Sequence, residues 1–114
     1  MAKLPEPTTT IIFELERRMW DIIYYTTSAK LNIFDRFGET EETIDQLEEL
    51  DNIVRNTNAV SSRFTTLLLK IAQTQPTLSS EIFNLVEQII EQAEEIIFVT
   101  EGSVQEIIRN WNLP

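Results

Sequence analysis

From Glu39 to Gln75 the sequence contains neither glycine nor proline, although Gly38 and Pro76 bound the segment on either side. Both residue types commonly mark the end of a helix. Within the segment, apolar or small residues recur at alternating steps of four and three, which is the spacing of one face of an α-helix. They are Thr43, Leu47, Leu50, Val54, Thr57, Ser61, Phe64, Leu68 and Ile71. We therefore predict one long helix over about 41–74.

The stretch "RNTNAVSSRF" at 55–64 has few apolar residues and lies near the middle of this helix. Asparagine, threonine and serine favour turns, so a linker is one interpretation. The unbroken spacing favours a helix that is slim at its middle, with Thr57 opposite Trp20 of an antiparallel neighbour. Either the indole fills the space beside the small residues, or Trp20, Thr57 and Ser61 line a mid-bundle pocket.

The remaining glycines and prolines divide the rest of the chain. Pro5 and Pro7 precede three threonines that can cap a helix, so residues 1–8 are predicted as an extended segment before a helix over about 9–37. A third helix is predicted over about 78–101, ending or bending at Gly102. Because Ser103 is followed by Glu106 at capping-box spacing, a short fourth helix is predicted over about 104–111, with a bent continuation of the third as the alternative.

These segments predict an all-α fold in one domain over 1–114. Short connections place successive helices antiparallel, which gives an up-down bundle of three long helices plus a short C-terminal one, resembling a four-helix bundle. Trp111 and Leu113 are expected to cap its open end rather than to bind a partner.

Two of the predicted helices carry more apolar surface than one neighbour can cover. In the first helix, Ile12, Leu15, Met19, Ile22, Ala29 and Ile33 form a core stripe; in the third, Leu78, Ile82, Leu85, Ile89, Ile96 and Val99 do so. A second apolar stripe in these helices gives a candidate interaction face consisting of Phe13, Trp20, Tyr24, Phe34, Phe83, Ile90 and Ile97. Either each of these helices packs against two others within a three-helix core, or one face is buried in an oligomer; we favour the second, which predicts a homodimer or an unidentified protein partner.

Composition excludes several classes of chemistry. The chain has no cysteine and no histidine, so it lacks a thiolate nucleophile, the commonest general base and the commonest zinc ligand. Its serines and threonines have no visible base to activate them. We therefore predict no catalytic, cofactor-binding or metal-binding residues, and a protein that is not an enzyme.

Charge and hydropathy restrict the partners. The net charge is −10, with seven acids and one base in residues 77–114, so a nucleic acid or an anionic membrane would be repelled. No uninterrupted apolar run exceeds four residues, which is far short of a membrane span. The N-terminal residues do not read as a secretory signal, and we expect a soluble, cytoplasmic protein.

Paired carboxylates offer the alternative hypothesis of a bundle that binds a small molecule or a divalent metal, such as a magnesium-dependent nucleotide hydrolase. All-helical nucleotide pyrophosphohydrolases hold magnesium with an E-x-x-E and an E-x-x-D pair on two antiparallel helices. Here Glu39/Glu42 and Glu48/Asp51 have these spacings but would lie on one helix. The sequence thus favours a non-enzymatic, self-associating interaction or regulatory module over a metal-dependent enzyme.

Overall fold

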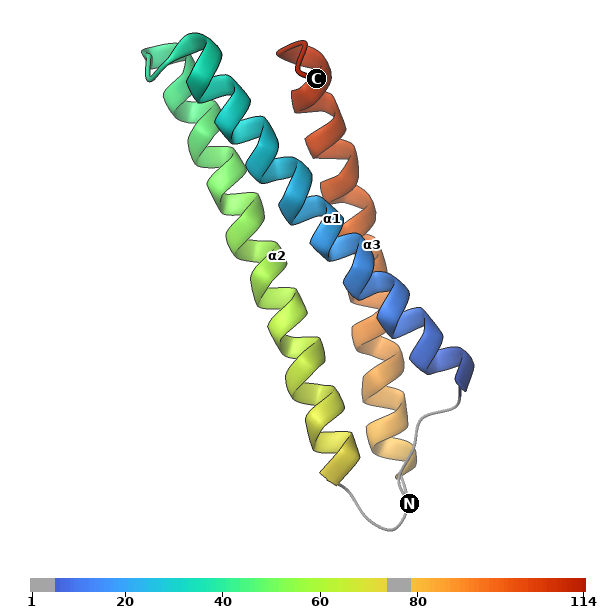
Figure 1. Cartoon of the computed structure of the whole chain (residues 1–114). Helices are drawn as coiled ribbons and strands as arrows, with labels where there is room; N and C mark the ends of the chain where they lie inside the picture. Colours follow the sequence, from blue (N-terminus) through green and yellow to red (C-terminus); the bar gives the residue numbers. More distant parts are fainter. Residues whose placement is uncertain (1–5, 74–78) are drawn as a thin grey trace.

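The computed structural model describes residues 6–73 and 79–114, and these form three α-helices. They are α1 (Glu6–Phe37), α2 (Glu41–Gln73) and α3 (Ser80–Asn110). Figure 1 shows α2 running opposite to both α1 and α3. The all-α prediction is confirmed. The predicted boundaries within 1–5 and 74–78 lie outside the described residues.

The turn between α1 and α2 forms as its residues predict. Gly38 adopts a left-handed φ of 69° that only glycine reaches at little cost, and its N–H donates to the Phe34 carbonyl at 2.9 Å. The hydroxyl of Thr40 then accepts a hydrogen bond from the N–H of Thr43 at 3.2 Å, which caps the first turn of α2. At its other end α1 begins earlier than expected, at Glu6, because Pro7 is tolerated in a first helical turn.

Helix α3 shows where the predicted architecture is wrong. Ser79 caps its start by accepting a hydrogen bond from the Ile82 N–H at 3.2 Å. The helix then continues through Gly102 to Asn110, so there is no separate helix over 104–111 and no resemblance to a four-helix bundle in the described chain. The hydroxyl of Ser103 donates to the Val99 carbonyl at 3.1 Å instead of capping a new helix.

Burial between the three helices explains why α3 does not break. Val104 and Ile107 lie beyond Gly102 and are both buried, so a continuous α3 keeps them in the core. A glycine inside a helix costs only about 1 kcal/mol relative to alanine, whereas burying a valine or isoleucine side chain contributes about 1.5–3 kcal/mol. Burial therefore outweighs the glycine.

The core follows one face of each helix. In α1 the predicted core stripe is buried throughout. In α2 the stretch 55–64 is helical, and the buried face of the helix continues through it at Thr57, Val60 and Phe64. The buried apolar side chains of the described residues are Ile12, Leu15, Met19, Ile22, Ala29, Ile33, Leu50, Val60, Phe64, Leu67, Ile71, Val86, Ile90, Ala93, Ile97, Val104 and Ile107.

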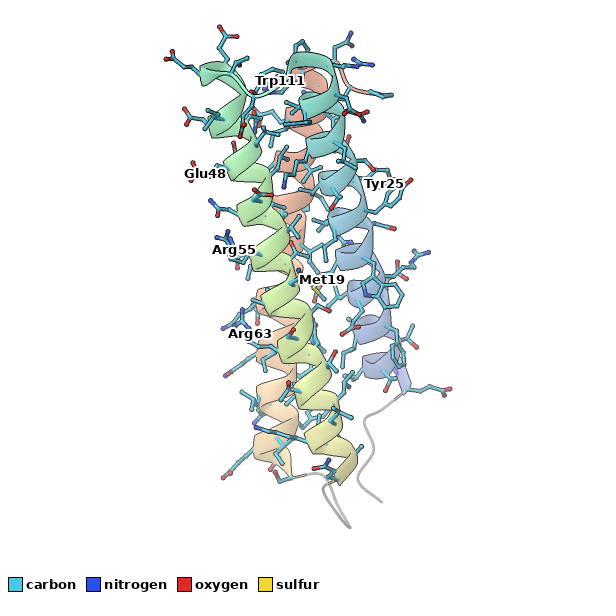
Figure 2. The ribbon with its side chains drawn as sticks, turned by 60° about the vertical axis from the view of Figure 1, so that its left-hand side comes forward. Met19, Tyr25, Glu48, Arg55, Arg63 and Trp111 are labelled. Carbon is cyan, nitrogen blue, oxygen red and sulfur yellow. The ribbon has the colours of Figure 1, made fainter. Side chains whose placement is uncertain are left out.

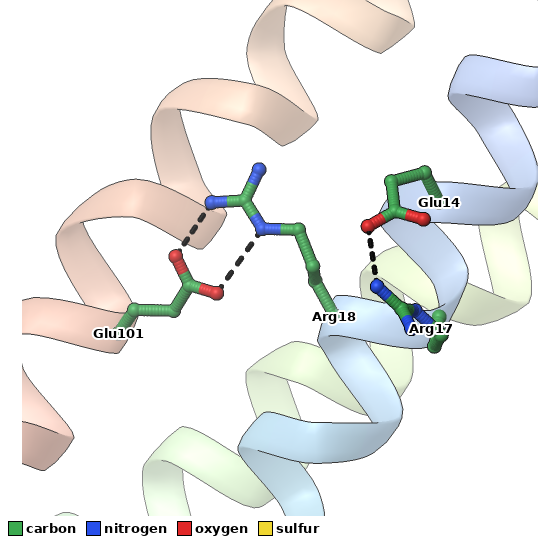
Figure 3. Close-up of polar contacts among 4 residues, drawn as sticks. All are labelled: Glu14, Arg17, Arg18 and Glu101. Atoms are coloured by element: carbon green, nitrogen blue, oxygen red, sulfur yellow. Dashed lines mark hydrogen bonds and ion pairs between the residues drawn. The ribbon is translucent and has the colours of Figure 1, made fainter.

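Polar contacts between helices lie around this core. The Lys30 ammonium is 2.6 Å from an Asp51 carboxylate oxygen and joins α1 to α2. Arg18 donates two hydrogen bonds to the Glu101 carboxylate, at 2.5 and 3.1 Å, and joins α1 to α3 (Figure 3). At the end of the bundle where α1 turns into α2, the Trp111 indole packs on Phe37 and covers the end of the helices, as expected.

Two glycine substitutions should have opposite effects on stability. Gly102→Ala should raise the free energy of unfolding by about 0.5–1 kcal/mol, because a methyl group there meets no atom within 4 Å and the position is helical. Gly38→Ala should lower it by about 1 kcal/mol, because φ is 69°. Urea unfolding of both variants measures these changes. A destabilised Gly102→Ala would contradict a continuous α3.

Candidate interaction surfaces

An exposed apolar stripe runs along the side of α1 that faces away from the core. We call it the outer stripe and define it as Phe13, Trp20, Tyr24, Leu31 and Phe34. Trp20 is 63% exposed and Tyr24 66%, although both are large aromatic side chains. With Arg17 and Thr27, the stripe repeats at alternating steps of four and three, which is the seam of a coiled coil. It therefore has the pattern of a surface that packs against another helix.

The middle of the outer stripe is hollowed. An open depression of about 550 Å³ is bordered by Trp20, Tyr24 and Leu31, with Ile23, Thr27 and Ser28 between them. Small residues thus alternate with large apolar ones, which leaves room for the side chains of a partner helix. Leu31 was absent from the predicted interaction face. Continuing the spacing of Trp20, Tyr24 and Thr27 by one further step would have found it.

The α3 half of the predicted interaction face lies elsewhere. Ile90 and Ile97 are 5% and 1% exposed and belong to the core, and Phe83 is half-buried against it. The stripe that was predicted as core is instead partly on the surface: Leu85, Ile96 and Val99 are 46%, 42% and 60% exposed. The structure therefore brings Phe13, Trp20, Tyr24 and Phe34 together on one surface without the three residues of α3.

The predicted mid-bundle pocket residues are likewise separated. Trp20 points outward and does not face Thr57, whereas Met19 and Ile22 border the space beside Thr57 together with residues of α3. Figure 2 shows Met19 between α1 and α2. The space there leaves about 0 Å³ for a water molecule. Ser61 is only half-buried and does not line this space.

The tight packing around Thr57 gives a stability prediction. Thr57→Leu should lower the free energy of unfolding by about 1–3 kcal/mol, because the added carbons have no space to occupy. Thr65→Leu is a matched control. Each threonine donates its hydroxyl to the carbonyl four residues earlier, at 2.7 Å for Thr57 and 3.2 Å for Thr65, but Thr65 is exposed. If urea unfolding shows equal effects at the two positions, the packing around Thr57 is not tight.

A second apolar surface lies between α2 and α3. Two neighbouring hollows of about 100 and 340 Å³ follow the line between these helices, and both are bordered by Arg63 and Ile89. We call this surface the α2/α3 groove. The described residues that line it are Val60, Ser62, Arg63, Thr66, Leu67, Lys70, Leu85, Ile89, Gln92, Ala93 and Ile96. Sequence reasoning missed it because it had assigned Leu85, Ile89 and Ile96 to the core.

The carboxylates of the described residues do not gather. No three of them lie together in a position to hold a metal ion. Asp51, one of the acids that the metal-binding hypothesis requires, is paired with Lys30 instead. Within the described parts of the chain, no helix has the length and apolar character needed to cross a membrane.

The carboxyl group of Glu16 has a raised pKa. It lies on α1 between Phe13 and Trp20, and its Oε1 atom is buried with no hydrogen-bond partner among the described residues. Burial disfavours the charged form and raises the pKa of Glu16 above its ordinary value of 4.5. The folded protein therefore holds this proton more tightly than the unfolded chain does.

This raised pKa predicts that replacing Glu16 by a neutral residue stabilises the folded protein, by an amount that depends on pH. The favourable contribution of the protonated carboxyl group is fully present below the unfolded pKa and is lost as the pH rises through the raised folded pKa. At pH 7 the buried charge is unfavourable, so Glu16→Gln should raise the free energy of unfolding by about 0.5 kcal/mol. Urea unfolding at pH 7 and pH 4 should show the gain shrinking at the lower pH. A gain that is the same at both would exclude the charge as its cause.

Comparison with known proteins gives no relative for this arrangement, since no family model, no curated protein and no solved structure matches the chain. Its two apolar surfaces are therefore interpreted from their own geometry and charge.

Proposed function

We propose that the protein is a non-enzymatic interaction module that associates with a second copy of itself through the outer stripe of α1. The observation that carries this proposal is the exposure of four aromatic side chains at coiled-coil spacing, between 52% and 66% for Phe13, Trp20, Tyr24 and Phe34. Contiguous apolar patches of this kind on soluble proteins commonly mark interaction sites.

The area of the outer stripe is sufficient for a small dimer interface. An aromatic side chain buries about 150–250 Å² when it is fully covered, so the exposed parts of the stripe amount to roughly 500 Å² per copy. Two copies would therefore bury on the order of 1,000 Å² in total, which is the lower end for a specific interface. Weak and transient contacts are typical of this end of the size range, so we expect a dissociation constant in the micromolar range.

The charge distribution favours a second copy at α1 over contact elsewhere. Helix α1 has five acids and four bases, whereas α3 has seven acids and one base. Two copies that met through α3 would repel each other, and two that met through α1 would not. Arg17, which lies between Phe13 and Trp20 of the outer stripe, is paired with Glu14 at 2.7 Å (Figure 3).

The pattern of the stripe favours an antiparallel pair of α1 helices. Parallel helices would place Arg17 against Arg17, which is unfavourable. Antiparallel helices that pair residues whose numbers sum to about 51 would place Trp20 against Leu31 and Tyr24 against Thr27. Large side chains then meet smaller ones, and Arg17 meets the ring of Phe34.

Light scattering across a dilution series tests this proposal. The mass of the unmodified protein should rise from one chain to two as its concentration increases through the micromolar range. Trp20→Glu should remain a monomer at every concentration, because it places a charge at the centre of the interface. The emission of Trp20 should also shift to shorter wavelength on association.

Phe98→Glu is the matched control for this experiment. Phe98 is the most exposed aromatic side chain that the structure describes, at 74%, but it lies on α3 and outside the outer stripe. It should associate as the unmodified protein does. A monomeric mass for the unmodified protein at all concentrations, or equal loss of association in both variants, would refute self-association through α1.

A further inference from the structure

We infer that the α2/α3 groove is a docking site for an amphipathic helix that carries acidic residues beside its apolar face and belongs to another protein. This goes beyond self-association through α1, because the groove and the outer stripe share no residue.

The floor of the groove is apolar and reaches the surface. Val60 and Leu67 of α2 lie on one side, and Ile89 and Ile96 of α3 on the other. Two of the α3 residues that line it, Leu85 and Ile96, are 46% and 42% exposed. The groove extends over about ten residues of each helix, which is roughly 15 Å or three helical turns. That length matches the apolar face of a short helix docked in a groove.

The groove stays open because α2 and α3 touch each other less than either touches α1. In a bundle with helices of this length, a further helix can occupy the position between two such neighbours, with its apolar face on their exposed apolar residues. The described residues supply no helix at this position.

The rim of the groove identifies the charge of its occupant. Arg63 borders both hollows and Lys70 borders the larger one, whereas no acid is among the residues that line either. This is unusual in a chain with nineteen acids and nine bases. Figure 2 shows Arg63 projecting from the side of α2 that is turned away from α1. Carboxylates that flank an apolar face would complement this rim, and basic residues would be repelled by it.

The groove and the overall charge of the chain favour peptides of opposite sign. A chain with a net charge of −10 should attract basic peptides through its overall field. The groove should select an acidic peptide against this field. A preference for the acidic peptide would therefore be a local property of Arg63 and its neighbours.

Fluorescence anisotropy with two labelled synthetic peptides tests the inference on the full chain. Each peptide has about fifteen residues, enough for a short helix, with leucines on one face. One has glutamates on both flanks of this face, and the other has lysines at the same positions. The acidic peptide should bind saturably and about fivefold or more tightly than the basic one, and added salt should weaken it.

Three variants locate the binding site. Arg63→Glu should weaken the acidic peptide about tenfold, because it reverses the charge at the groove. Arg55→Glu makes the same change at an exposed arginine of α2 that does not line the groove, and should alter the affinity less than about twofold. Trp20→Glu, on the outer stripe, should leave it unchanged.

Several results would overturn the inference. They are absence of saturable binding, equal or tighter binding of the basic peptide, equal effects of Arg63→Glu and Arg55→Glu, or loss of binding in Trp20→Glu alone. If Arg63→Glu instead abolishes self-association in light scattering, the occupant of the groove is a second copy of the chain and not another protein.

Discussion

Burial of the inner face of α1 against both other helices is the interaction on which the rest of the structure depends. Ile12, Leu15, Met19 and Ile22 are all nearly inaccessible to solvent and belong to the same core cluster as residues of α2 and α3. Helix α1 contacts each of the other helices more extensively than these contact each other. Because α1 holds the other two helices together, the groove between α2 and α3 remains open along its length.

The same arrangement explains why the opposite side of α1 is exposed. A helix packed against two neighbours on one side has no third neighbour for its other side. The outer stripe has the residue types and spacing of a helix interface and lies on this side, away from the core. The two arginines nearest to it are engaged in ion pairs, the Arg17 guanidinium with Glu14 and the Arg18 guanidinium with Glu101 (Figure 3).

The buried polar residue of the 55–64 stretch, Thr57, fits the core because its hydroxyl group is satisfied within its own helix. Thr57 is 5% exposed and donates to the Ile53 carbonyl of its own helix at 2.7 Å. A threonine can therefore occupy a buried helical position without a partner on another helix, here beside a space that Met19 and Ile22 also border. This is why a polar stretch in the sequence is compatible with an uninterrupted helix.

Sequence periodicity predicted the inner face of α1 and the continuity of α2. It assigned the wrong face of α3 to the core, because we expected this helix to end or bend at Gly102. If α3 ends at residue 101, its two apolar stripes are equally apolar, and nothing in the pattern selects one of them. If α3 continues, the stripe of Ile90 and Ile97 extends to Val104, whereas the stripe of Leu85 and Ile96 extends to polar Ser103 and Glu106. Only the first can lie in a continuous core, so the position of the helix end determines which face is buried.

The α2/α3 groove could not be predicted for the same reason, because its apolar floor consists of the α3 residues that the shorter helix would have buried. The surface available to partners is thus set by whether one glycine breaks a helix.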